Sequence, residues 1–119
     1  MCGIVGFNFE DEQLAKELGE LLKHRGPDGE GYYKDNGVTL GHRRLSIVDL
    51  SDKGSQPMTN EDGTVWLTYN GEIYNFEGIK EDLLAEGHDF TSETDSEVLI
   101  HGYEEYGSDL LEKLNGQFA

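Results

Sequence analysis

The sequence has few basic residues and no long apolar segment. Nine Lys and Arg residues stand against 25 Asp and Glu residues in a chain of 119, which gives a formal net charge of −16. Nucleic-acid binding requires many Lys and Arg residues to neutralise phosphates, so this composition argues against it, and anionic membrane surfaces are disfavoured for the same reason. No run approaches the roughly 18 apolar residues of a membrane span, and acidic residues follow the start too early for a signal peptide. We therefore expect a cytoplasmic protein that binds neither nucleic acid nor membrane.

Cysteine is also scarce. One cysteine cannot form an internal disulfide, and no Cys pair or close His pair has zinc-site spacing. Gly26, Gly29 and Gly31 form neither a GxGxxG nor a Walker loop, so nucleotide binding is not indicated. The sequence therefore predicts no metal site, and the four histidines, at positions 24, 42, 88 and 101, are expected to be isolated from one another.

The length and the patterning indicate one domain of the α+β class, with the first half mostly strands. A buried strand is expected over residues 3–9, followed by an amphipathic helix with Asp11 as its N-cap. Two dipeptides, Asn36-Gly37 and Asp62-Gly63, suit the positive-φ positions of type I′ turns, so each predicts a hairpin.

Helical periodicity dominates the second half of the chain. One helix is expected from Asn75 to Gly87, and a second begins at the capping box formed by Thr94 and Glu97. A third is expected over residues 109–115. The sequence then ends on apolar residues, which suggests a strand that the complete domain continues.

The only cysteine follows the initiator methionine directly, so removal of Met1 would make Cys2 the N-terminal residue. An α-amine, with an ordinary pKa of ~8, can accept the proton of a thiol on the same residue, which then acts as a nucleophile. Lone cysteines are also often small buried hydrophobic residues. Position alone leaves both interpretations of Cys2 open.

All three arginines, Arg25, Arg43 and Arg44, lie in two short clusters. A guanidinium can hold a carboxylate through two parallel hydrogen bonds, so a confined arginine is a candidate clamp for a substrate carboxylate. A structural ion pair with one of the many acidic side chains is the alternative for each of them.

Two further places could carry chemistry. The Asn70 amide and the Gly71 N–H could donate together to an oxyanion, as in acyl-transfer sites, although Asn-Gly is more often a simple turn. Asp95, one residue inside a predicted helix N-terminus, could interact with the helix dipole or bind a substrate ammonium group.

Five motifs follow one another along the chain: Cys2-Gly-Ile-Val-Gly6, His24-Arg-Gly-Pro-Asp-Gly29, Gly41-His-Arg-Arg-Leu-Ser-Ile-Val-Asp49, Tyr69-Asn-Gly-Glu-Ile-Tyr-Asn75 and Thr94-Asp-Ser-Glu-Val98. In this order they resemble the class II glutamine amidotransferase domain of asparagine synthetases. The resemblance covers nearly all 119 residues, and the Arg-Gly-Pro-Asp form is similar to the asparagine-synthetase branch, which includes synthetase-like proteins of polysaccharide clusters.

The resemblance implies an N-terminal nucleophile (Ntn) hydrolase that acts on glutamine. Cys2 would attack the side-chain amide with its own α-amine as the base, and Asn70 with the Gly71 N–H would form the oxyanion hole. Hydrolysis of the thioester would give glutamate, and the released ammonia would pass to a synthetase domain or chain for amide transfer to aspartate.

The resemblance also implies how glutamine is held. Arg44 would bind its α-carboxylate, and Glu72 and Asp95 would lie near its α-ammonium group. Arg25 and Arg43 are expected to be structural.

The fold that the resemblance implies is a four-layer αββα sandwich of antiparallel sheets, with residues 1–119 as its N-terminal portion. The sequence stops before the later strands and the ATP-dependent synthetase domain. ATP and Mg²⁺ are therefore expected only in that absent domain, and this domain is expected to need no cofactor. An unpaired strand at the truncated C-terminus would favour a homo-oligomer.

Two alternative functions stay open at this stage. A catalytically silent glutamine-binding or interaction module is one, because a retained Met1 separates the free amine from the thiol by one residue. An Ntn amidase for another substrate is the other, and it would keep Cys2 without needing Arg44, Glu72 and Asp95.

Overall fold

The computed structural model gives the structure of residues 1–46 and 52–119, so residues 47–49 of the second arginine motif lie outside the described residues. The described elements, with two 3₁₀ turns labelled η, are β1 (Gly3–Phe7), α1 (Glu12–Leu21), β2 (Gly29–Asp35), β3 (Val38–Arg44), η1 (Asp52–Gly54), β4 (Met58–Thr59), β5 (Trp66–Leu67), β6 (Gly71–Ile73), α2 (Phe76–Ala85), α3 (Glu97–Tyr106), η2 (Gly107–Asp109), α4 (Leu110–Lys113) and β7 (Gly116–Phe118).

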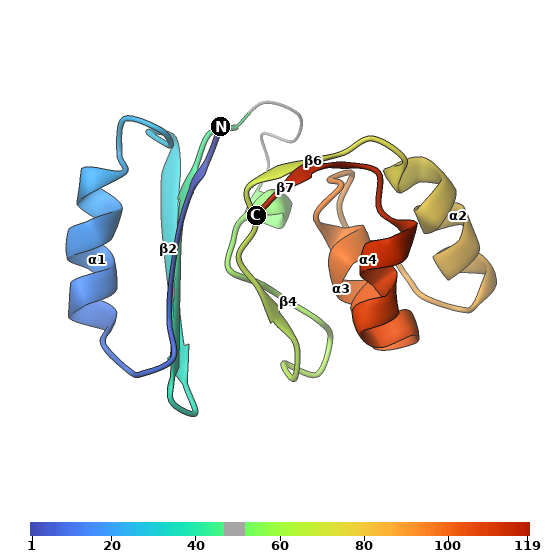
Figure 1. Cartoon of the computed structure of the whole chain (residues 1–119), viewed down its shortest axis with the longest axis horizontal. Helices are drawn as coiled ribbons and strands as arrows, with labels where there is room; N and C mark the ends of the chain where they lie inside the picture. Colours follow the sequence, from blue (N-terminus) through green and yellow to red (C-terminus); the bar gives the residue numbers. More distant parts are fainter. Residues whose placement is uncertain (47–51) are drawn as a thin grey trace.

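The N-terminal part is a three-stranded antiparallel sheet in the order β1-β3-β2, with α1 packed on one face (Figure 1). The turn between β2 and β3 has positive φ at both Asn36 (50°) and Gly37 (77°), as the predicted type I′ turn requires. Helix α1 approaches the sheet closely at Gly19, where a Cβ would overlap the Tyr32 hydroxyl. The predicted N-cap is confirmed, since the Asp11 side chain accepts a hydrogen bond from the Leu14 N–H at 2.9 Å.

The first strand is shorter and more exposed than predicted. It ends at Phe7, and Phe9 is 48% exposed. The chain leaves the sheet there because the Thr39 hydroxyl donates to the Phe9 carbonyl and accepts from the Asp11 N–H, which fixes the turn into α1.

The C-terminal part has its own core between α2, α3 and β6, built on Tyr69, Ile73, Ile79, Leu83 and Val98. The strand pairs β4–β5 and β6–β7 lie between the N-terminal sheet and the helices in Figure 1. Contacts between the halves include the stacked Tyr33 and Trp66 rings, 3.8 Å apart, and a hydrogen bond from the Thr68 hydroxyl to the Gly41 carbonyl. The molecule is thus a mixed α/β fold with antiparallel sheets, as the sequence predicted at the level of fold class.

The second predicted hairpin forms, since β4 pairs antiparallel with β5, but its turn is not of type I′. Gly63 has a positive φ of 73° but Asp62 does not, and residues 60–65 form a longer connection between β4 and β5. The Asn60 side chain determines this conformation because its Oδ1 accepts hydrogen bonds from the backbone N–H groups of Thr64 and Val65.

The predicted capping box at α3 is also wrong. The helix begins at Glu97, and Asp95 lies in the turn before it rather than inside it. Instead of the Thr94 N–H, the Glu97 carboxylate accepts the N–H groups of Thr91 and Ser92 and the hydroxyl of Ser92. These bonds hold the preceding segment against the helix start.

The last predicted helix is shorter than residues 109–115. It starts as the 3₁₀ turn Gly107–Asp109 and continues only to Lys113, because Leu114 is extended. The Asn115 carbonyl accepts the Tyr74 N–H at 2.7 Å, so the chain enters the β6–β7 pairing immediately.

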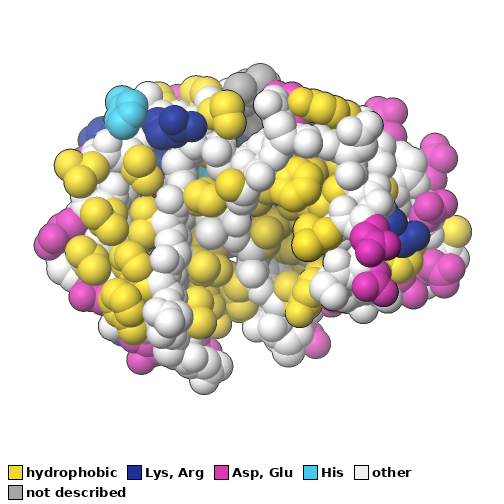
Figure 2. Space-filling model, in the orientation of Figure 1, with side chains coloured by type: hydrophobic (Ala, Val, Ile, Leu, Met, Phe, Trp, Pro, Cys, Tyr) yellow, Lys and Arg dark blue, Asp and Glu magenta, His cyan; other side chains and the backbone are white. Residues whose placement is uncertain are grey.

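The surface reflects the composition. Figure 2 shows acidic side chains at the two outer ends of the visible face and hydrophobic side chains across its left half and centre. In the ranges 1–46 and 52–119, no helix is long and apolar enough to cross a membrane.

Candidate functional site

One cavity of about 430 Å³ brings together residues from distant parts of the chain. It lies where the start of β1, the end of β3, the start of β6 and the turn before α3 meet. Its volume is in the range of about 300–1,000 Å³ usual for small-molecule sites. All six residues that the sequence predicted as catalytic or substrate-binding line it: Cys2, Arg44, Asn70, Gly71, Glu72 and Asp95.

Cys2 lies beside the end of β3 because the next residue, Gly3, pairs with Arg43 across the sheet. The Leu45 N–H donates to the Cys2 Sγ at 3.3 Å, and the Arg25 Nε donates to the Cys2 carbonyl at 3.2 Å. Cys2 is half-buried and lines the cavity. Both the backbone and the sulfur of Cys2 are therefore held in place.

The strand register directs the Gly71 N–H toward the cavity side. Asn70 and Ala119 exchange two backbone hydrogen bonds at 2.9 Å, so the next pair, Gly71 and Phe118, is a pair without backbone hydrogen bonds. The Gly71 N–H points away from β7, in the same direction as the N–H of Ile73 two residues later. That Ile73 N–H donates to Asp95 at 2.8 Å. The Gly71 N–H is consequently available to a ligand on this side.

Asp95 is anchored through one carboxylate oxygen. Its Oδ2 accepts hydrogen bonds from the Ile73 N–H and, at 2.9 Å, from the Tyr69 hydroxyl. Burial raises the pKa of Tyr69, and the charges of Asp95 and Glu72 raise it further, so the hydroxyl stays protonated as a donor. The turn before α3 therefore presents a fixed negative charge to the cavity.

Arg44 and Glu72 contribute opposite charges. The Arg44 guanidinium is half-buried and lies against Gly54, where an added Cβ would come within 2.9 Å of its Nη2 and 3.0 Å of Thr94 Cγ2. A side chain at position 54 would thus displace the guanidinium. Glu72 is exposed at the cavity rim, on β6 opposite Gln117.

Sequence reasoning missed three residues that position this site, namely His42, Gln56 and Tyr69. The Tyr69 carbonyl accepts a hydrogen bond from His42 Nε2 at 3.2 Å, and the Tyr69 N–H donates to Gln56 Oε1 at 2.6 Å. Both bonds fix the backbone directly before Asn70. His42 belongs to a motif that the sequence analysis singled out, but nothing in the local sequence of Gln56 indicates its contact.

His42 is neutral in the folded protein. Burial lowers its pKa from 6.5 to about 4, the charge of Arg44 lowers it too, and the hydrogen bond to Tyr69 opposes this shift. A neutral ring with a carbonyl partner carries its proton on Nε2. His42 is therefore a positioning residue for the loop that carries Asn70.

Arg43 makes structural ion pairs. Its buried guanidinium contacts the carboxylates of Glu20 and Glu30, which come from α1 and β2. Arg25, also expected to be structural, holds the Cys2 carbonyl as described above.

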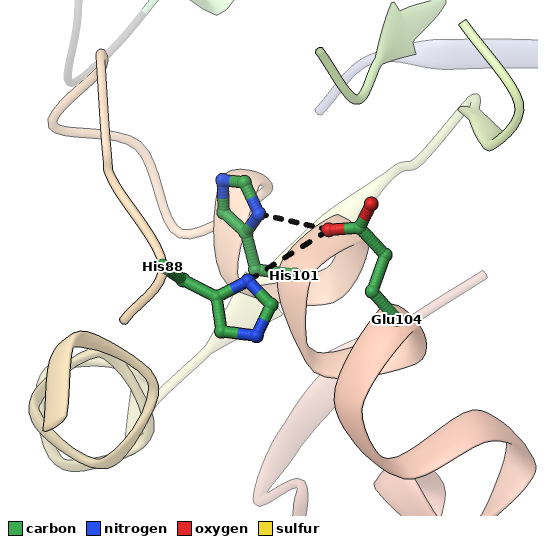
Figure 3. Close-up of side chains that lie close together, drawn as sticks. All are labelled: His88, His101 and Glu104. Atoms are coloured by element: carbon green, nitrogen blue, oxygen red, sulfur yellow. Dashed lines mark hydrogen bonds and ion pairs between the residues drawn. The ribbon is translucent and has the colours of Figure 1, made fainter. Parts of the chain in front are cut away.

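The prediction that all four histidines are isolated is wrong for two of them. The rings of His88 and His101 lie 5.2 Å apart, and Glu104 lies beside both (Figure 3). These histidines are thirteen positions apart in the sequence, so their spacing does not match a local metal motif. Their side chains and Glu104 are close enough to hold one metal ion.

Comparisons with known proteins agree with the motifs. The chain is 43% identical over 127 residues to asparagine synthetase (glutamine-hydrolyzing) 1 of Bacillus subtilis (strain 168), and 44% identical over 126 residues to a probable asparagine synthetase (glutamine-hydrolyzing) of Dictyostelium discoideum. It is 45% identical over 125 residues to asparagine synthetase (glutamine-hydrolyzing) 2 of Oryza sativa subsp. japonica. Each comparison covers 100% of this chain but only 20%, 22% and 21% of the relative, respectively, so the chain spans about a fifth of the length of these relatives.

The family comparison covers the chain from end to end. The family model described as a glutamine amidotransferase domain matches residues 1–119. Together with the resemblance of the five motifs, this match shows that the chain belongs to the glutamine amidotransferase domain family.

Proposed function

We propose that this chain hydrolyses the side-chain amide of glutamine through Cys2 and releases ammonia for transfer to an acceptor. The observation that carries the proposal is the cavity lined together by Cys2, Asn70 and Gly71 and by charged side chains of both signs. An α-amino acid with a terminal amide has the complementary groups.

The reaction proceeds through a thioester. Cys2 Sγ forms a bond to the amide carbon of glutamine, and the carbonyl oxygen becomes an oxyanion that accepts hydrogen bonds from the Asn70 amide and the Gly71 N–H. The carbon–nitrogen bond then breaks, and the proton taken from the thiol leaves with ammonia. Water attacks the thioester and the carbon–sulfur bond breaks. Glutamate is released, and the free thiol is regenerated.

The base for the first step is the α-amine of Cys2 after Met1 has been removed. While Met1 is attached, the nitrogen of Cys2 belongs to a peptide bond and cannot accept the thiol proton. Intact Met1 therefore predicts a protein that binds glutamine without turning it over.

Recognition of glutamine uses both charged ends of the amino acid. Arg44 pairs with the α-carboxylate through its planar guanidinium. The α-ammonium group lies near Asp95, whose Oδ2 is already occupied by protein donors, and near Glu72 at the rim. This arrangement selects a free amino acid over an amide within a peptide.

The ammonia serves a synthetase module outside residues 1–119. We propose aspartate as its acceptor because the relatives described above carry the name asparagine synthetase. ATP and Mg²⁺ belong to that module. An acceptor from a polysaccharide pathway is the alternative, and measuring amide transfer to aspartate by the complete protein separates the two.

We propose that the complete domain is a four-layer αββα sandwich, which the order helix, sheet, strand pairs and helices supports (Figure 1).

A cytoplasmic location suits a function that needs the free thiol of the only cysteine. Exposed apolar side chains, among them Leu111 (62%) and Phe118 (44%), support self-association when this chain is alone.

Glutamate release tests the proposal. The Met1-free chain, verified by intact mass, should produce glutamate and ammonia in equal amounts, and Cys2→Ala should lose this activity. His24→Ala, at an exposed residue that does not line the cavity, is the matched control and should keep it. Glutamine binding without glutamate release from the Met1-free chain would instead identify a silent binding module.

A further inference from the structure

A second cluster of chemistry-bearing side chains lies outside the Cys2 cavity. His88 is in the connection between α2 and α3, and His101 and Glu104 are three residues apart on α3. Figure 3 shows both imidazoles directed at the same carboxylate. Glu104 Oε2 lies 3.1 Å from His101 Nδ1 and 3.8 Å from His88 Nδ1, and one ligand atom from each residue lies within 4.8 Å of the others.

Each of the three side chains also contacts a further residue through its second ring nitrogen or its second carboxylate oxygen. His88 Nε2 lies 2.9 Å from Glu105 Oε2, and His101 Nε2 lies 3.5 Å from Glu97 Oε1. Glu104 Oε1 accepts a hydrogen bond from the Asn60 amide at 2.7 Å. Histidines that bind metals typically donate their other N–H to a carboxylate, which fixes both tautomer and orientation.

The near side of the cluster converges on one oxygen atom. His101 Nδ1 is hydrogen-bonded to Glu104 Oε2 at 3.1 Å, and His88 Nδ1 lies 3.8 Å from the same oxygen. A metal ion takes the place of ligand protons when it binds, so an ion between these three atoms would replace the hydrogen bond to Glu104.

The surrounding side chains are predominantly acidic. Glu97 and Glu61 lie 3.5 Å and 3.9 Å from His101 Nε2, and Glu105 lies 2.9 Å from His88 Nε2. Carboxylates on this side of the cluster would stabilise a bound cation.

The cluster is rigid on one side and reachable from solvent on the other. His101 is 2% exposed and packs edge-on against Phe90 at 4.8 Å, so its ring is fixed. The side chains of His88 and Glu104 are 18% and 27% exposed, which leaves solvent access to one side of the cluster. An ion can enter there, and a water molecule can complete its coordination.

We propose that His88, His101 and Glu104 form a zinc site that fastens the α2–α3 connection to α3. Two imidazoles and one carboxylate suit Zn²⁺, whereas Mg²⁺ and Ca²⁺ prefer oxygen ligands. Tetrahedral ligands about 2.0–2.1 Å from zinc are about 3.3 Å apart, so small side-chain rotations bring the three atoms into place. None of the three residues lines the Cys2 cavity, and the site is independent of the proposed glutamine chemistry.

Calorimetric titration of the tag-free, metal-free protein with ZnCl₂ tests the site. We expect one Zn²⁺ per chain, a higher melting temperature with zinc, and no comparable effect of MgCl₂. His88→Ala and Glu104→Gln should each weaken binding by at least 10-fold, and Glu105→Gln should weaken it by about 10- to 100-fold through loss of the outer hydrogen bond.

Matched controls distinguish this site from other zinc ligands. His24→Ala removes an exposed histidine outside the cluster, and Cys2→Ala removes the only thiol; both should bind zinc like the wild type. Co²⁺ in the wild type should give the visible absorption of a tetrahedral N/O site, which an ion-pair network alone cannot produce. Absence of stoichiometric zinc binding, or unchanged affinity in folded His88→Ala and Glu104→Gln, would overturn the proposal.

Discussion

Acidification should destabilise the protein through His42. This imidazole is 2% exposed, and its folded-state pKa of about 4 lies below its ordinary value of 6.5. The unfolded chain therefore binds the proton more readily than the folded one. The contribution to stability is complete above pH 6.5 and is lost as the pH falls toward 4.

The two pKa values set the size of the effect. At pH 5 the ring is mostly protonated in the unfolded chain and mostly neutral in the folded protein. Proton linkage then lowers the free energy of unfolding by about 2 kcal/mol between pH 7 and pH 5, and by about 3 kcal/mol once both states are protonated. The ring that takes up the proton is the same ring that joins β3 to the segment before Asn70.

Urea unfolding at pH 7 and pH 5 measures the effect. His42→Gln keeps a donor for the Tyr69 carbonyl but does not titrate, so the pH-dependent loss should be about 2 kcal/mol smaller in the variant than in the wild type. Subtracting the two removes contributions of other titrating groups. Equal pH dependence, or an NMR titration showing that the wild-type His42 ring protonates near pH 6.5, would refute the reasoning.

Three substitutions in the Cys2 cavity should separate binding from chemistry and stability. Arg44→Ala should raise KM roughly 10- to 150-fold, as expected for a lost charge-assisted bond of about 1.5–3 kcal/mol, with a smaller change in kcat; an unchanged KM would exclude Arg44 as the clamp. Asn70→Ala should lower kcat on the order of 10² to 10³-fold with little change in KM, and an effect on unfolding alone would support a simple turn role. Gly71→Ala should destabilise the fold by about 1–3 kcal/mol or more because its Cβ would overlap the Gln117 carbonyl, and a wild-type urea midpoint would contradict that packing.

Features governed by neighbouring residues were predictable from the sequence. The N-cap at Asp11 and the turn at Asn36-Gly37 formed as expected, because a side-chain acceptor and two positive-φ positions act within a few residues. Cys2 was singled out by its position in the chain, whereas the motif resemblance assigned its catalytic role. The sequence alone could not show that the six predicted residues share a cavity.

Other features depend on which groups a side chain meets once the chain has folded, and the local sequence pattern did not predict them. Asn60 bonds the following backbone and overrides the turn expected at Asp62-Gly63. Glu97 binds the preceding segment instead of capping its own helix. The contact between His88 and His101 arises only when the α2–α3 connection folds back onto α3.

Labelling with a thiol-directed glutamine analogue tests the central role of Cys2 most directly. The Met1-free chain should gain the mass of one adduct, peptide mapping should place it on Cys2, and excess glutamine should prevent it. An analogue with the same reactive group but no α-carboxylate should react much more slowly, because Arg44 cannot hold it. Labelling that glutamine does not slow, or equal reaction with both analogues, would contradict a glutamine site built around Cys2.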